Sequence, residues 1–209
     1  MKNKILFFSL FFIFLLCAKK ELFKGNENIE EIFKKSIEFY NKRKYKQAIE
    51  GFKKVIYAKE ISENTDDAQF YLAMCYYKIK DYEQSFMEFK FLKDHFPNSE
   101  YKEESEFMMI KIEFSQLPNE ELDQEKTYEI IRNANNFIKN YPESKFKKEI
   151  EDIIKKCREK IAKKIFNTMN LYLKMNKKES AKIYFQILKE EYSDLDIYKK
   201  ANKIFENKK

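Results

Sequence analysis

The sequence is poor in the residues that build tight turns. It has 2 Gly and 3 Pro in 209 residues, and it has no Trp. Because β-hairpins and short turns depend on Gly and Pro, a strand-rich fold is excluded. Hydrophobic residues make up 44% of the chain and aromatic residues 17%, which is enough for a substantial apolar core. These proportions predict an all-α protein whose helices are joined by short connections.

The residues of familiar catalytic and metal sites are also scarce. His95 is the only histidine, and its place before Phe96-Pro97 at an expected helix end indicates a solvent-facing or capping role. The sequence has no nucleophile elbow, phosphate-binding loop or zinc-protease motif. Cys75 and Cys157 lie far apart in helical patterns, without a CxxC or histidine neighbour, which indicates small buried side chains. We therefore expect no enzymatic activity, no cofactor and no metal site.

No block of one charge sign dominates the chain. The net charge is +7, from 42 basic and 35 acidic residues, most of them interspersed on expected helix faces. Removal of Lys2 and Lys4 with an N-terminal signal leaves 40 basic and 35 acidic residues, a net charge of +5. This charge is too small and too scattered for a nucleic-acid-binding surface, so we expect no nucleic-acid partner.

The apolar run at the start of the chain is predicted to be a secretion signal of the lipoprotein type. Lys2 and Lys4 precede apolar residues 5–16, and Cys17 follows directly. The run is shorter than the about 20 residues that cross a bilayer, and it has the length of a secretory signal. A cysteine at this place resembles the site that is diacylated in bacterial lipoproteins. Residues 1–16 are thus predicted to be a signal peptide, Cys17 the lipidation site and residues 17–28 a lipidated tether.

The residues around the cysteine depart from the usual pattern. Leu16 stands where the lipobox prefers Gly, Ala or Ser, and Phe14 where it prefers Leu. An uncleaved signal anchor and an ordinary signal peptide are therefore the alternatives. Ala18 differs from the Asp that retains lipoproteins in the inner membrane, which is compatible with the outer membrane. Two or more acyl chains would hold the protein stably on the membrane.

A helix–turn–helix pattern recurs behind this segment. Residues 81–99, DYEQSFMEFKFLKDHFPNS, and residues 126–144, KTYEIIRNANNFIKNYPES, have equal length, and each closes with an aromatic-Pro pair near its end. The first copy pairs with residues 68–80 across a break at Lys80-Asp81, and small Ala73 and Ser85 let the two helices approach. Apolar residues at three- and four-residue steps give each helix one buried face. The pattern resembles the tetratricopeptide repeat of about 34 residues. It is carried by Leu72, Ala73, Tyr76, Tyr82, Ser85, Phe89, Leu92 and Pro97.

Further copies predict an array of about four repeats. Matching positions are Ser36, Phe39, Ala48, Phe52 and Val55 in the first, Thr127, Ile130, Ala134 and Phe137 in the third, and Met169, Tyr172, Ala181, Phe185 and Leu188 in the fourth. A long helix is expected over residues 147–174 and a closing helix over residues 195–207. Since one repeat cannot bury its own apolar face, the copies must stack into a superhelix. Repeats 1–2 are assigned to residues 29–100, and repeats 3–4, an insertion and the closing helix to residues 101–209.

The first helix of each repeat lines the inner surface of such arrays, which predicts a peptide-binding groove. Its aromatic and adaptable residues suit an extended apolar or aromatic segment. Packing of the same side chains against neighbouring helices is the alternative. The groove lacks the Lys and Asn residues by which some repeats clamp a terminal carboxylate. The predicted groove residues are Phe33, Ile37, Tyr40, Asn41, Phe70, Met74, Tyr77 and Lys78.

The order of these features resembles the BamD family of outer-membrane β-barrel assembly lipoproteins. Behind the cysteine and two regular repeats come an insertion with Leu122-Asp123 and a helix ending in Tyr141-Pro142-Glu143-Ser144. A long helix with Ile161-Ala162 and a repeat that contains Tyr172 and closes with Tyr192-x-Asp194 follow. Two departures are Ser193, where the family usually has proline, and a single closing helix where it typically has a full fifth repeat.

The resemblance implies a scaffold on the periplasmic face of the outer membrane. Its C-terminal repeats would bind the central barrel protein BamA, with Tyr172 and Tyr184 as partner-binding residues. Tyr184 falls where some members carry an arginine implicated in signalling to that partner. The N-terminal repeats would receive the aromatic-ended C-terminal segments of unfolded outer-membrane proteins. The alternatives are a periplasmic repeat adaptor in envelope division or peptidoglycan coordination, and a lipid-anchored accessory subunit of an envelope hydrolase or transporter.

Overall fold

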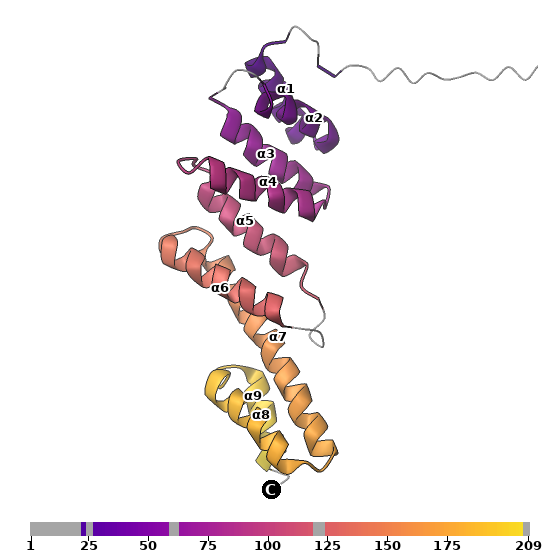
Figure 1. Ribbon diagram of the computed structural model, residues 1–209, viewed down its shortest axis with the longest axis vertical. Coiled ribbons are helices and arrows are strands. Elements are labelled where there is room, and N and C mark those ends of the chain that lie inside the picture. The colour runs from indigo at the N-terminus through magenta and orange to yellow at the C-terminus, as the bar shows by residue number, and fades with distance from the viewer. Residues whose placement is uncertain (1–21, 24–26, 59–62, 119–123, 207–209) are drawn as a thin grey trace, which may run out of the picture.

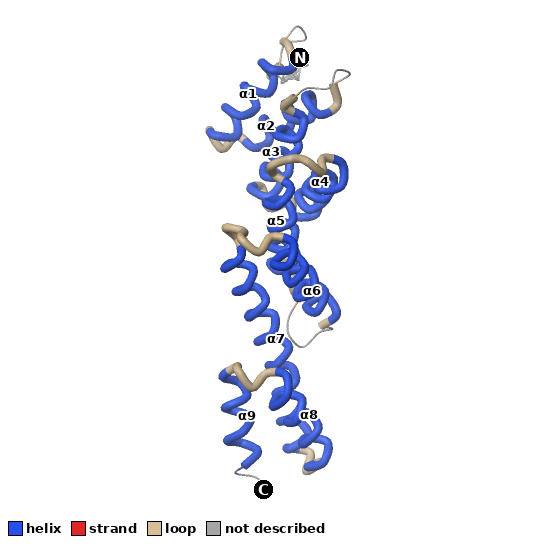
Figure 2. Tube along the Cα trace, turned by 90° about the vertical axis from the view of Figure 1, so that its left-hand side faces the viewer, coloured by secondary structure: helices blue, strands red, loops and turns tan. Residues whose placement is uncertain are grey.

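The computed structural model describes residues 22–23, 27–58, 63–118 and 124–206, and all regular elements in these ranges are α-helices. The helices stack along one long axis, with α1 and α2 at one end and α8 and α9 at the other (Figures 1 and 2). Consecutive helices pair into four repeats, and α9 closes the array, so the predicted all-α repeat fold is confirmed. None of the described helices has the length and apolar composition of a bilayer span. The helices are α1 (Ile29–Asn41), α2 (Tyr45–Ile56), α3 (Thr65–Lys78), α4 (Tyr82–His95), α5 (Lys102–Ser115), α6 (Glu125–Asn140), α7 (Lys147–Lys174), α8 (Lys178–Glu191) and α9 (Asp196–Glu206).

The core follows the axis of the array as three apolar clusters. The first joins α1, α2 and α3 around Phe52, the second joins α3 to α7 around Phe89 and Phe137, and the third joins α7, α8 and α9 around Leu188. All four side chains are at most 1% exposed, as their helical spacing predicts. Each cluster takes residues from more than one repeat, which is why the repeats must stack to be stable.

The two cysteines that the structure describes are core residues, as predicted. Cys75 and Cys157 are fully buried and free. Burial raises the pKa of Cys75 to about 12 and that of Cys157 to about 11. Because the thiolate is the reactive form, both thiols are inert at neutral pH.

Small side chains let the two helices of a repeat approach closely. In the second repeat, the buried Ser85 hydroxyl donates a hydrogen bond of 2.9 Å to the carbonyl oxygen of Ala73. This bond ties α4 to α3 and satisfies the only polar atom of the Ser85 side chain. A larger residue at either position would push the two backbones apart.

Three of the four repeats use the same tight turn between their helices. Arg43, Lys80 and Asn176 have φ values of 58°, 65° and 58°, in the left-handed region. The N–H of Lys80 donates to the carbonyl of Tyr77, and the next N–H donates to the carbonyl of Tyr76, which is the Schellman pattern. Glycine would fit these positions without strain, whereas an L-residue there costs about 1–2 kcal/mol. The turns that the low glycine content argued against are therefore present and are made by other residues.

Each aromatic-Pro pair begins a second recurrent turn, between repeats. The N–H of Ser99 donates to the carbonyl of Phe96, and the Ser99 hydroxyl accepts a hydrogen bond from the N–H of Tyr101 at 3.2 Å. This turn places the Tyr101 ring on Phe70 of the preceding first helix, with ring centroids 4.3 Å apart.

The next junction has the same geometry. Ser144 accepts from the N–H of Phe146 at 3.0 Å, and the Phe146 ring stacks on Phe107 at 4.2 Å. The two similar sequence stretches thus each deliver an aromatic ring onto the preceding repeat.

Helix α7 connects the two halves of the molecule. Its 28 residues extend over about 42 Å at 1.5 Å per residue. Ile150 and Cys157 belong to the second core cluster, and Ile161 and Met169 belong to the third. In Figure 1, α7 runs from the level of α6 to the turn before α8.

The segment before α1 was expected to be a free tether, but part of it belongs to the first repeat. Phe23 is 3% exposed, and its ring packs edge-on against Phe39 at 6.0 Å. The space for the ring exists because residue 51 is glycine: a Cβ there would lie 2.4 Å from Phe23 and 1.9 Å from Ser36 Oγ. The predicted signal peptide, Cys17 and Leu122-Asp123 lie outside the described residues.

Candidate partner-binding surfaces

A row of tyrosines runs from the first helices of the two N-terminal repeats to the start of the third repeat. Tyr40 of α1 and Tyr71 of α3 have ring centroids 5.1 Å apart, and Tyr101 follows at 6.3 Å from Tyr71. All three side chains are half-buried, so part of each ring stays accessible. We call Tyr40, Tyr71 and Tyr101 the tyrosine row.

The tyrosine row lies in a carboxylate-rich environment. The Tyr101 hydroxyl donates a hydrogen bond of 2.8 Å to Asp67. Burial is the main cause that raises the pKa of Tyr40 to about 12. Burial also raises the pKa of Tyr71, and the negative charge of Asp67 is the second cause of that shift. Glu104 on α5 adds to both shifts. The hydroxyls therefore stay protonated at physiological pH, and the surface as a whole is aromatic and acidic.

The predicted groove residues divide into three groups in the structure. Asn41 and Lys78 are exposed at the ends of α1 and α3. Phe33, Ile37, Tyr40, Met74 and Tyr77 are half-buried, pack against the first or second core cluster and keep part of their surface accessible.

Phe70 differs from the other predicted groove residues, because only 6% of its surface is exposed. Its ring is covered by Tyr101 and contacts Phe89. The prediction that Phe70 lines an accessible surface is corrected for this reason: Phe70 is a core residue. Tyr71 and Tyr101 take its place on the accessible side.

A cleft of about 560 Å³ opens where α6, α7 and α8 meet. Its floor is apolar, with buried Ile161 and half-buried Ile165, and Tyr128 at its side is 43% exposed. Arg132 of α6 and Lys164 of α7 add two cationic groups to the lining. The complete lining is Gln124, Glu125, Tyr128, Arg132, Ile161, Lys164, Ile165, Thr168 and Tyr184. The volume lies in the range of sites that bind a small ligand or a peptide side chain.

The two tyrosines that the resemblance singles out lie together at this cleft. Tyr172 of α7 stacks on Tyr184 of α8 with centroids 5.4 Å apart, and Tyr184 lines the cleft. The sequence pointed to Tyr184 but not to Tyr128, Arg132 or Lys164. These three come from helices whose angles the repeat pattern does not specify.

The closing Tyr192-x-Asp194 pair fastens α7 to the end of the array. Arg158 of α7 donates two hydrogen bonds to the Asp194 carboxylate, of 2.7 and 2.8 Å, and lies 5.7 Å from the Tyr192 ring centroid. The Arg158 hydrogen bond is the main cause that lowers the pKa of Asp194. This bidentate contact lies at the surface and adds to the apolar cluster that joins α7, α8 and α9.

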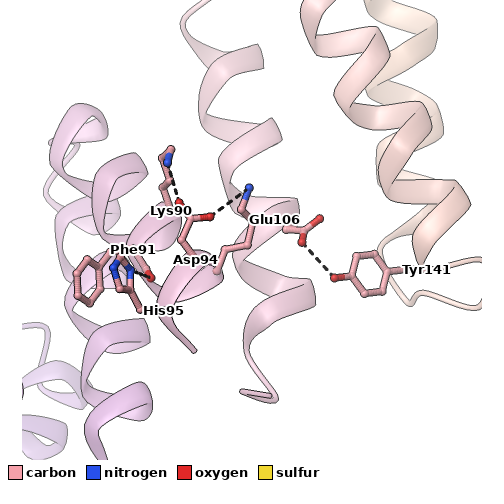
Figure 3. Close-up of polar contacts among 7 residues, drawn as sticks. Lys90, Phe91, Asp94, His95, Glu106 and Tyr141 are labelled. Atoms are coloured by element: carbon pink, nitrogen blue, oxygen red, sulfur yellow. Dashed lines mark hydrogen bonds and ion pairs between the residues drawn. The ribbon is translucent and has the colours of Figure 1, made fainter. Parts of the chain in front are cut away.

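The single histidine occupies a structural place. His95 is exposed at the end of α4, its Nδ1 lies 3.1 Å from the carbonyl oxygen of Phe91, and its ring stacks on Phe91 at 4.0 Å (Figure 3). The same view shows the Lys90–Asp94 ion pair and the hydrogen bond that Tyr141 donates to Glu106. Within the described ranges, no three His, Cys, Asp or Glu side chains gather in a way that would hold a metal ion.

Comparison with known proteins places the chain in a family. A search of curated proteins returned no match. A family model described as YfiO, outer membrane lipoprotein, matches residues 26–209, which includes all four repeats and the closing helix. Since this match covers most of the chain, the protein belongs to the YfiO family of outer membrane lipoproteins.

Proposed function

We propose that the protein is a BamD-type scaffold of the outer-membrane β-barrel assembly machinery, lipid-anchored through Cys17 on the periplasmic face. It would bind a BamA-like barrel protein through the cleft between α6, α7 and α8. It would receive C-terminal segments of unfolded outer-membrane proteins on the first-helix surface of repeats 1–2. The observation that carries the proposal is the pair of accessible aromatic surfaces in the two halves of one continuous array, in a chain of the YfiO family.

The chemistry of the N-terminal surface indicates which part of a substrate segment it would hold. Half-buried Phe33, Ile37, Met74 and Tyr77 adjoin the tyrosine row and offer contact area for aromatic and aliphatic side chains. Asp67 and Glu104 beside the row would repel a terminal carboxylate. The surface therefore suits the apolar and aromatic side chains of the segment, while its carboxylate stays in water.

The cleft has complementary chemistry. The exposed Arg132 favours a carboxylate, and Tyr128, Tyr184 and Ile165 favour an apolar or aromatic neighbour of that carboxylate. A loop of a folded partner that presents one acidic and one apolar side chain would satisfy both. This is the kind of contact that we assign to the barrel protein.

Site-specific photo-crosslinking tests the two assignments separately. A photoreactive phenylalanine at position 71 should capture unfolded barrel substrates, and one at position 184 should capture the barrel protein. The control position is Phe91, a 41% exposed aromatic on the second helix α4, which should capture neither. Equal capture at all three positions would contradict the assignment of surfaces.

Charge reversal in the cleft tests the partner contact. Arg132→Glu should reduce co-purification of the barrel protein from detergent-solubilised membranes. Lys139→Glu, the same change at an exposed position near the end of α6, should leave it unchanged. Depletion of the protein should also lower the amount of β-barrel proteins in the outer membrane. Unchanged barrels together with division or peptidoglycan proteins in the pull-down would favour the envelope-adaptor alternative.

A further inference from the structure

The positive charge of the protein is concentrated at one end of the array. Residues 17–58 contain 11 basic and 6 acidic residues, whereas residues 59–209 contain 29 of each. The net charge of +5 that remains after the signal is removed therefore belongs to the N-terminal segment and the first repeat. The rest of the array is neutral as a whole, although charged residues cover its surface.

Two of these cations flank the ring that fixes the N-terminal segment to the first repeat. Lys35 of α1 has its Nζ 5.0 Å from the Phe23 ring centroid and pairs with Glu27 at 3.0 Å. Lys54 of α2 is exposed and has its Nζ 5.4 Å from the same centroid. With Phe39 and the space at Gly51, they form a seat in which Phe23 is 97% buried. The packing of its ring thus fixes Phe23 against the first repeat.

The seat lies close to the predicted lipid anchor. Phe23 follows Cys17 by six residues, and six residues reach at most about 20 Å when fully extended. A chain anchored at Cys17 therefore holds the α1–α2 end near the lipid headgroups. The same end carries Tyr57, which is 73% exposed and lies one helical turn beyond Lys54. Tyrosine and lysine are residues that settle at membrane–water interfaces.

We propose that the face around the Phe23 seat, formed by Lys35, Lys54 and Tyr57, rests on an anionic phospholipid surface. The proposal depends on the anchoring at Cys17 that is part of the proposed function. The anchor supplies the occupant, because it keeps the lipid headgroups at high effective concentration beside this face whether or not a protein partner is bound. Lysines near an anionic leaflet attract it, and this attraction is screened by salt. Phe23 then holds the first repeat at a defined orientation to the membrane.

A fluorescence-quenching experiment on the full lipoprotein in vesicles tests this contact. Tyr57→Cys, labelled with an aromatic fluorophore, reports on the proposed face, and Lys200→Cys on exposed α9 is the control at the opposite end. Selective labelling is feasible because Cys75 and Cys157 are buried and Cys17 is acylated on sulfur when processed. The vesicles contain phosphatidylcholine with or without phosphatidylglycerol, and a spin label on the lipid headgroup acts as quencher.

We expect quenching of the Tyr57 probe to be at least about two-fold stronger on the anionic vesicles and to lose this excess in 1 M salt, where the Debye length falls to about 3 Å. Lys35→Glu with Lys54→Glu should remove the excess, whereas Lys199→Glu with Lys200→Glu in the Tyr57→Cys chain should not. Lys35→Gln with Lys54→Gln should act in the same direction without placing new carboxylates beside Glu27. Circular dichroism checks that each variant is folded.

Several results would overturn the contact. Quenching that is equal at both probe positions, or indifferent to lipid charge and salt, would do so. Shielding of the Tyr57 probe only after addition of membrane proteins would assign the face to an acidic protein partner. Absence of fatty-acid label at Cys17 would also overturn it, while the crosslinks at positions 71 and 184 would still test the proposed surfaces. Conversely, normal quenching in an Arg132→Glu chain that no longer binds the barrel protein would separate the two proposals.

Discussion

Gly51 is the position where one added methyl group has the most predictable effect. In Gly51→Ala, the new Cβ would lie 1.9 Å from Ser36 Oγ and 2.4 Å from Phe23 Cζ. Ser36 cannot simply turn away, because its hydroxyl donates a hydrogen bond of 2.6 Å to the carbonyl of Ile32. Loss of that buried hydrogen bond costs about 1–3 kcal/mol. Expulsion of Phe23 from its seat would cost about 1.5–3 kcal/mol instead.

The opposing term is the better helix propensity of alanine. It stabilises an exposed helix interior by about 0.5–1 kcal/mol relative to glycine. The net expectation is a destabilisation of about 1–2 kcal/mol, which lowers Tm by about 2–8 °C for a chain of this size. Chemical and thermal denaturation followed by circular dichroism measure both values.

A double variant distinguishes this explanation from a general effect on helix α2. In Ser36→Ala the Oγ atom is absent, so Gly51→Ala should cost less in that background than in the natural chain. A stabilised Gly51→Ala protein, or an equal cost in both backgrounds, would refute the reasoning about the seat.

Three further predictions concern single side chains. Ser85→Ala should destabilise the protein by about 1 kcal/mol because it removes the hydrogen bond to Ala73. Ser105→Ala should be neutral or stabilising, because the buried Ser105 hydroxyl has no hydrogen-bond partner among the described residues. Denaturation of the two variants side by side measures the contrast. Lys80→Gly should stabilise the second repeat by about 0.5–1 kcal/mol, since it relieves a left-handed residue at an exposed turn, and loss of stability would contradict the strain assigned there. Burial raises the pKa of Glu113, so the folded protein binds a proton there more tightly than the unfolded chain does. The free energy of unfolding should therefore fall as the pH rises from 4.5 through the folded pKa. Glu113→Gln should flatten that part of a stability–pH curve and raise the stability at pH 7.

The buried positions of the array could be predicted because residue type and helical spacing decide them locally. Phe89 and Leu92 of one stretch stand at the same places as Ala134 and Phe137 of the other, and all four are fully buried. The adjacent pair Phe70-Tyr71 could not be resolved in the same way. Apolar residues surround most of α3, so periodicity does not say which of two neighbouring rings faces the core.

The cleft and the Phe23 seat depend on information that a repeat pattern does not contain. The cleft is made by Tyr128, Arg132 and Tyr184, which meet only because of the angles between α6, α7 and α8. The seat had one local signal, a glycine inside an otherwise regular helix, which indicates close approach by another part of the chain. The sequence does not say which aromatic residue fills the space. The recurrent Pro-x-Ser-x-aromatic spacing at Tyr101 and Phe146 was a signal that could have located the tyrosine row.

The continuity of α7 has a mechanical consequence for the whole protein. One uninterrupted helix belongs to two of the three apolar clusters, so the neighbouring modules cannot swivel independently about a flexible joint. A tilt of only about 10° at one end of a rod about 42 Å long moves the other end by about 7 Å. A displacement of α7 at the end that packs on α6 would thus be carried to α8 and α9, with α7 acting as a lever arm.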